Sequence, residues 1–157
     1  MLPVMSRLVE LSHGTFASAP PIENFVPAIV VQSVGPVRHE VSVPFHDSQV
    51  RGKAVLIQTG WDRHWGTEFY WEPGPTLAES LIFRMVRSGV RIVGVDFYIT
   101  GPSAGTQLML GGKIPIVENL VGLSSAPRWG FRFGTAPARP PEGAASCPVR
   151  AFAEMTE

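Results

Sequence analysis

Three apolar segments in the middle of the chain are each followed by side chains that could transfer protons. Asp62, Arg63 and His64 follow the first segment, Asp96 follows the second and Glu118 follows the third. A carboxylate or an imidazole can take up and release a proton near neutral pH, so these residue types suit general acid–base chemistry. In α/β proteins, sites form at the carboxyl ends of parallel strands. The pattern predicts an active-site rim, with Glu118, His64 and Asp62 as candidate catalytic residues.

Two tryptophans, Trp61 and Trp65, flank the charged triplet 62–64. As aromatic walls they could hold a planar substrate while Asp62 and His64 move protons. The alternative is structural: the triplet lies in a turn, and its charges pair with one another or with a neighbouring subunit. The sequence favours the structural interpretation, and both remain open at this point.

Glu118 and Asp96 also have two interpretations each. Glu118 could bind a metal or activate water, or it could cap a strand end or pair with an arginine, because burying a lone charge is costly. Asp96 precedes a loop that contains Ser103. A nucleophilic serine needs a base and an oxyanion hole, and the loop lacks the Gly-x-Ser-x-Gly elbow. The sequence therefore favours Asp96 as an acceptor that orders the loop.

The elements that must position these residues are predicted from apolar patterning. Continuous apolar runs predict buried strands at 54–58, 90–95 and 114–117. Between the first two, an amphipathic pattern predicts a helix over Thr76–Ser88, with Thr76 and Glu79 as a capping box and Gly89 at its end. A strand, a helix and a strand in this order predict a right-handed parallel crossover.

The remaining elements have weaker signals. Short strands are predicted at 7–11, 26–33, around 41–43, at 131–135 and at 149–153, with a short helix at 108–110 and a loop over 13–24. The chain contains no internal repeat. Together the elements predict an α/β fold, a single domain over 1–157 with a mixed sheet.

Composition excludes several classes of function. The 157 residues carry 13 basic and 13 acidic side chains, and neither sign forms a block, which argues against a nucleic-acid or polybasic membrane surface. Apolar runs are far shorter than the ~20 residues of a membrane span. The N-terminus has no secretory pattern, and the single Cys147 fits a reducing compartment, so we expect a cytoplasmic protein.

Several motifs resemble the cyclase family, whose best-known member is bacterial kynurenine formamidase. They are RLVELSH at the start, then GKAVLIQTGWDRHWG, GVRIVGVD, GGKIPIVENL, GFRF and the closing CPVRAFA. The half 51–157 matches well, whereas the half 1–50 is shortened and divergent. The resemblance implies a swivelling β/β/α fold, a homodimer or homotetramer with sites near subunit contacts, and hydrolysis of an amide or related bond with zinc or manganese.

The family's metal ligands come from a His-x-Gly-Thr-His-x-Asp-x-Pro-x-His motif and a later His and Glu, and most are replaced here. With the motif aligned on the shared Gly-Thr pair, the other positions hold Ser12, Phe16, Ser18, Ile22 and Thr106. Glu118 keeps the family's glutamate, and His13 replaces the first ligand only through a one-residue slip. A second alignment treats LSHGTF as the family's opening and the whole motif as deleted. The candidate metal ligands are thus Glu118 and His13, and Phe16 joins the tryptophans as a candidate substrate-binding residue.

Two hypotheses for function follow. The first is a hydrolase of a C–N bond in an arylformamide or another small amide, as in tryptophan catabolism, with Glu118 serving a metal or activating water. Asp62 and His64 are then the next candidates for proton transfer. The second is a non-catalytic cyclase-like protein that keeps the fold and the oligomer interface and binds a small molecule or a partner chain.

Overall fold

The computed structural model describes residues 6–12, 17–19, 25–33, 40–99, 113–137 and 147–156. The strands are β1 (Ser6–Glu10), β2 (Ala17–Ala19), β3 (Val26–Gln32), β4 (Glu40–Val41), β5 (Ala54–Gln58), β6 (Thr76–Leu77), β7 (Ile92–Val95), β8 (Ile116–Val117), β9 (Phe131–Pro137) and β10 (Cys147–Thr156). The helices are α1 (Asp47–Val50) and α2 (Glu79–Ser88), with 3-10 turns η1 (Trp61–His64), η2 (Glu68–Trp71) and η3 (Leu123–Ser125).

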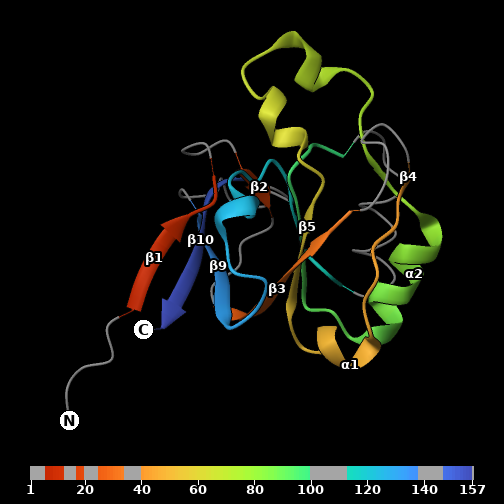
Figure 1. Cartoon of the computed structure of the whole chain (residues 1–157), viewed down its shortest axis with the longest axis vertical. Coiled ribbons are helices and arrows are strands. Elements are labelled where there is room, and N and C mark those ends of the chain that lie inside the picture. Colours follow the sequence, from red (N-terminus) through yellow and green to blue (C-terminus); the bar gives the residue numbers. More distant parts are fainter. Residues whose placement is uncertain are drawn as a thin grey trace.

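One large sheet contains both parallel and antiparallel strands, as predicted. Its order is β1-β10-β9-β3-β5-β7-β8, and β2 pairs with β10. Strands β3, β5, β7 and β8 are parallel to one another, whereas β1, β2 and β9 are antiparallel to β10. Strand β3 joins the two parts because it pairs in parallel with β5 and antiparallel with β9. Figure 1 shows α2 and the β1–β10 pair on opposite sides of β3 and β5.

The central strands are buried on both faces, which explains their continuous apolar sequences. Alternate residues point to opposite faces of a strand. Ile29 and Val55 therefore join one hydrophobic core, whereas Val30 and Leu56 join the other. The first core lies between the sheet and α2, and the second lies beneath β9 and β10.

Helix α2 is shorter than predicted. It begins at Glu79 after Ala78, whose extended backbone provides no side-chain cap, so the predicted capping box between Thr76 and Glu79 is wrong. The reason is tertiary: Thr76 and Leu77 form β6, which pairs in parallel with β4. Gly89 ends the helix as predicted, with a left-handed φ of 77°. The parallel pairing of β5 with β7 on either side of α2 confirms the parallel crossover.

Most other predicted strands are present with shifted ends. The strand at 114–117 shortens to β8, and those at 131–135 and 149–153 lengthen into β9 and β10. The predicted loop over 13–24 is wrong at Ala17–Ala19, because this segment pairs with β10 as β2. The predicted helix at 108–110 lies outside the described residues. No helix in the described part of the chain is long and apolar enough to cross a membrane.

Candidate functional site

The carboxyl ends of β5 and β7 are joined by one carboxylate, Asp96. It accepts hydrogen bonds from the Thr59 amide (2.8 Å), the Thr59 hydroxyl (2.5 Å) and the Gly60 amide (2.7 Å). Asp96 is fully buried. Burial raises its pKa to about 6, although the three hydrogen bonds oppose this rise. These contacts favour the interpretation of Asp96 as an acceptor that orders a loop, because no face of the carboxylate is open to a substrate.

Glu118 lies at the same edge of the sheet, directly after β8. Its Oε1 accepts a hydrogen bond from the Ile99 amide at 2.5 Å, which ties the segment after β7 to the end of β8. The carboxylate is partly exposed. Burial raises its pKa, and the hydrogen bond from Ile99 opposes this rise. Among the described residues its second oxygen has no hydrogen-bond donor.

Tyr70 lies beneath this edge and was not predicted from the sequence. Its buried hydroxyl donates a hydrogen bond to Asn119 Oδ1 at 2.8 Å. Burial raises the pKa of Tyr70, and the charges of Asp96, Asp62 and Glu118 raise it further, so the phenol keeps its proton and acts as a donor. Tyr70 is therefore a neutral donor near the negative charges of this edge.

Asn119 holds the turn that follows Glu118. Its φ is 58°, in the left-handed region that asparagine tolerates better than most residues. Its amide donates to the Phe97 carbonyl at 3.1 Å, and its side chain receives the Tyr70 hydroxyl. The VENL sequence offered Asn119 as a polar neighbour of Glu118. No local pattern links it to Tyr70, which lies 49 positions away.

The charged triplet in η1 is occupied by contacts within the chain. Asp62 Oδ2 accepts a hydrogen bond from the Gly122 amide at 3.1 Å. The Arg63 Nε donates to His64 Nε2 at 3.2 Å, and the His64 ring lies 4.6 Å from the Phe69 ring. This geometry favours the structural interpretation of the triplet. Figure 1 shows η1 and η2 extending beyond the carboxyl end of β5.

Trp61 is a core residue in this structure. Only 1% of its surface is exposed, and its Nε1 donates to the Tyr70 carbonyl at 3.1 Å. A Cβ placed on Gly74 would lie 2.8 Å from the indole, so the chain packs closely against the ring. The predicted substrate-binding role of Trp61 would require an open face of the indole, and the described packing leaves little of it exposed.

Trp65 belongs to a different group of aromatic residues, which lies closer to the surface. Its ring centroid lies 4.9 Å from Tyr70 and 6.0 Å from Trp71. Trp71 is 55% exposed and lies 5.2 Å from the Tyr98 ring. Because Tyr98 precedes Ile99, whose amide binds Glu118, this aromatic cluster (Trp65, Tyr70, Trp71 and Tyr98) borders the site.

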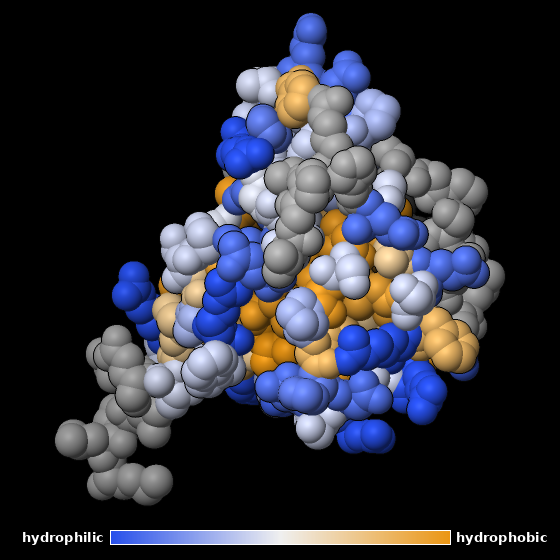
Figure 2. Space-filling model, turned by 45° about the vertical axis from the view of Figure 1, so that its right-hand side comes forward, coloured by the Kyte–Doolittle hydropathy of each residue, from blue (hydrophilic) through white to orange (hydrophobic). Residues whose placement is uncertain are grey.

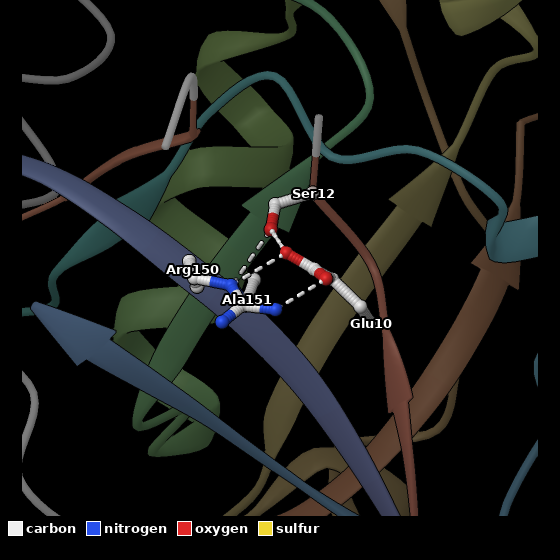
Figure 3. Close-up of polar contacts among 4 residues, drawn as sticks. All are labelled: Glu10, Ser12, Arg150 and Ala151. Atoms are coloured by element: carbon white, nitrogen blue, oxygen red, sulfur yellow. Dashed lines mark hydrogen bonds and ion pairs between the residues drawn. The ribbon is translucent and has the colours of Figure 1, made fainter. Parts of the chain in front are cut away.

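Ser12 falls at the family's first ligand position in the alignment on the Gly-Thr pair, and its hydroxyl has partners on both sides. It donates to Glu10 Oε1 at 3.0 Å and accepts the Ala151 amide at 3.1 Å (Figure 3). Arg150 holds the same glutamate through bonds of 2.9 and 2.7 Å. We name these four residues the β1–β10 joint. Its backbone reaches the site, because Ser12 forms an isolated bridge with Leu120.

The residues present do not fit the family's metal centre. Among the described residues, no group of three or more His, Cys, Asp or Glu side chains could hold a metal ion. Zinc sites need histidine, cysteine or carboxylate ligands, and the family positions hold other residue types. These are Ser12, Phe16, Ser18, Ile22 and Thr106. Residues 13, 16, 22 and 106 lie outside the described ranges, so the predicted roles of His13 and Phe16 remain predictions.

Comparison with known proteins adds relatives of the same fold. An uncharacterised protein of Methanocaldococcus jannaschii is 26% identical over 99 residues, 52% of each chain. A potential metal-dependent hydrolase with cyclase activity superimposes with a TM-score of 0.66 at 16% identity, over 95% of this chain and 87% of that one. An isatin hydrolase bound to the product analogue thioisatinate gives 0.64 at 16% identity, over 85% and 61%.

The structural matches and the family match support different conclusions. At 16% identity the structural matches establish the fold and not the reaction. The chain also spans only about half the length of the M. jannaschii protein and 61% of the isatin hydrolase. The family model described as putative cyclase matches residues 18–101, which is more than half of the 157 residues. This protein therefore belongs to the cyclase family.

Proposed function

We propose that this protein is a hydrolase that cleaves a C–N bond, of the amide or formamide type, in a small molecule. Membership of the cyclase family supports the proposal, as do structural neighbours named as hydrolases. The observation that carries it is the environment of Glu118. One of its oxygens is fixed by the Ile99 amide, and the other has no donor among the described residues.

Glu118 is suited to activate a water molecule. Because burial raises its pKa, the carboxylate accepts a proton more readily than an exposed glutamate does. In the proposed reaction, Glu118 takes a proton from water while the water oxygen attacks the carbonyl carbon. The proton then passes to the leaving nitrogen as the C–N bond breaks, and the products are a carboxylic acid and an amine.

Neighbouring residues position this carboxylate and border the substrate. Tyr70 is a positioning residue, because its hydroxyl fixes the Asn119 side chain directly after Glu118. Trp71 and Tyr98 offer partly exposed aromatic faces beside the Ile99 amide, which favours a planar substrate. In this proposal, Asp62 and His64 order the turn and do not transfer protons.

A second function, a non-catalytic cyclase-like scaffold, is favoured by a specific observation. In the alignment on the Gly-Thr pair, the first ligand position holds Ser12, and its hydroxyl forms hydrogen bonds with Glu10 and Ala151 within the β1–β10 joint. If the other ligand positions are equally committed, the protein keeps the family fold without the family reaction. It would then bind a small molecule or a partner chain.

An activity assay separates the two functions. The purified protein is incubated with N-formylkynurenine and, separately, with isatin, which contains a cyclic amide. If Glu118 activates water, Glu118→Gln should lower kcat/KM by about 100-fold or more. The matched control is Glu79→Gln, an exposed glutamate on α2, which should leave kcat/KM unchanged.

One result would contradict the hydrolase, and another would contradict the role of Glu118. If the folded wild-type protein turns over neither substrate, with metal content measured on the same sample and with zinc or manganese added, the scaffold function is supported. If the wild type is active and Glu118→Gln retains full activity, the protein is a hydrolase but Glu118 is not its base.

A further inference from the structure

A groove runs along the side of β3, away from the Glu118 edge. Strand β3 pairs with β5 over Ala28–Gln32, but it pairs with β9 only over Val26–Ala28. Beyond that point, the Val30 amide donates to the carbonyl of Arg128, which precedes β9, at 3.0 Å. Lys53 lines the groove and directly precedes β5, at the opposite end of that strand from Thr59 and Gly60.

The groove has the size and the walls of a small-molecule site. Its volume is about 930 Å³, within the range of ligand pockets. The apolar part of its described lining includes Ile29, Val30, Val31, Pro44 and Trp129. Trp129 is 74% exposed, so its indole offers an open flat apolar face to a ligand. On the face drawn in Figure 2, apolar residues gather in a hollow bordered by hydrophilic ones.

Among the described residues, the charged lining of the groove is positive. Lys53 and Arg128 are the ionisable residues in this part of its lining, and no described carboxylate lines it. The ion pairs of the described residues involve other arginines, so neither cation has a carboxylate partner there. The Arg128 Nη2 donates a hydrogen bond to Gln32 Oε1 at 2.9 Å, which directs the guanidinium toward β3. A positioned guanidinium can bind a carboxylate through its remaining N–H groups.

We propose that this groove binds a small organic anion with a flat apolar body, of the aromatic carboxylate class. The body lies against Trp129 and the β3 side chains Ile29 and Val31, and the carboxylate faces Arg128 and Lys53. The proposal is independent of the reaction at Glu118, because the two sites share no residue. A negative result here therefore leaves the hydrolase proposal unchanged.

Calorimetric titration with three probes tests the class of ligand. The probes are 2-naphthoate, the neutral 2-naphthamide, and acetate, which lacks the flat body. We expect 2-naphthoate to bind about tenfold more tightly than 2-naphthamide, because a hydrogen bond to a charged group contributes more than a neutral one. Acetate should bind more weakly than either. Equal affinity for 2-naphthoate and 2-naphthamide, or no binding of 2-naphthoate at millimolar concentration, overturns the proposal.

Variants locate the site on the molecule. Arg128→Gln and Lys53→Gln should each weaken 2-naphthoate binding about tenfold and leave 2-naphthamide binding nearly unchanged. Trp129→Ala should weaken both. The matched control is Arg87→Gln, an exposed cation on α2, which should change neither. Circular dichroism checks that each variant is folded.

Two outcomes of the variant series overturn the proposal. If Arg87→Gln weakens 2-naphthoate binding as much as Arg128→Gln, the attraction is a general charge effect and the groove is not its site. If the protein is a dimer by sedimentation and Trp129→Ala dissociates it, a second copy of the chain occupies the groove instead.

Discussion

Two regions of the molecule bind carboxylates with different partners, and the carboxylate pKa values shift in opposite directions. At the Glu118 edge, Asp96 and Glu118 accept hydrogen bonds from backbone amides, and burial raises both pKa values. In the β1–β10 joint, Glu10 is paired with Arg150, and hydrogen bonding to this guanidinium lowers its pKa. A backbone amide orients a carboxylate without a full opposing charge, whereas an arginine neutralises it.

The two regions therefore suit different roles: the Glu118 edge suits proton transfer, and the β1–β10 joint stabilises the fold. The Glu118 edge keeps carboxylates whose proton affinity is raised, which is the property that a general base needs. The joint keeps a carboxylate whose proton affinity is lowered, and it uses Ser12 as a second link between β1 and β10. The two regions meet where Ser12 bridges Leu120, two residues after Glu118.

Removing the Asp96 carboxylate should have the largest effect on stability. Asp96→Ala leaves the amides of Thr59 and Gly60 and the Thr59 hydroxyl without their acceptor in a buried place. We expect a loss of about 3–4 kcal/mol in the free energy of unfolding, measured by urea denaturation at pH 7. The control Glu72→Ala, at an exposed position, should change it little. A loss below about 1 kcal/mol would show that these donors find water instead.

The two regions should also respond to pH in opposite directions. The pKa of Asp96 rises from 3.8 to about 6 on folding, so the folded state binds this proton more tightly than the unfolded state does. Stability from Asp96 is therefore greatest near pH 4 and falls as the pH rises to about 6, by on the order of 2 kcal/mol. For Glu10 the pKa is lowered, so its contribution is present above its unfolded value of 4.5 and is lost as the pH falls.

Variants separate these two contributions. In urea denaturation at a series of pH values between about 2 and 7, Asp96→Asn should remove the fall in stability between pH 4 and about 6. Glu10→Gln should instead remove a loss that appears only at lower pH. If the slope of the wild type between pH 4 and 6 survives in Asp96→Asn, another group causes it, and Glu118 is the next to test because its pKa is also raised.

Local sequence patterns predicted those elements of the fold that depend on residues close together in the chain. Continuous apolar runs located the buried strands, Gly89 marked the end of α2, and the strand–helix–strand order gave the parallel crossover. The polar residues that follow these strands, Asp96 and Glu118, do lie at one edge of the sheet. The predicted capping box at Thr76 is wrong because Thr76 and Leu77 pair with β4 as a strand and are not part of the helix.

The contacts that define the site depend on pairs distant in the chain, and periodicity carries no information on them. Asp96 binds Thr59 across 37 positions, and Tyr70 binds Asn119 across 49. Ser12 receives the Ala151 amide across 139 positions. Aligning Ser12 with a ligand position shows only that a histidine is missing there. The contact of the Ser12 hydroxyl with the Ala151 amide depends on the pairing of β1 with β10, which the sequence does not reveal.

The smallest of the three effects should come from Ser12→Ala, and it tests whether the joint acts only on stability. The substitution removes the acceptor of the buried Ala151 amide and one donor to Glu10, for a loss of about 1–2 kcal/mol in unfolding free energy. The control is Ser124→Ala in η3, where the serine is exposed. Since Ser12 does not touch Asp96, the fall in stability between pH 4 and 6 should be the same as in the wild type. A changed slope would mean that the bridge between Ser12 and Leu120 couples the joint to the Glu118 edge, and the two regions would then have to be treated as one.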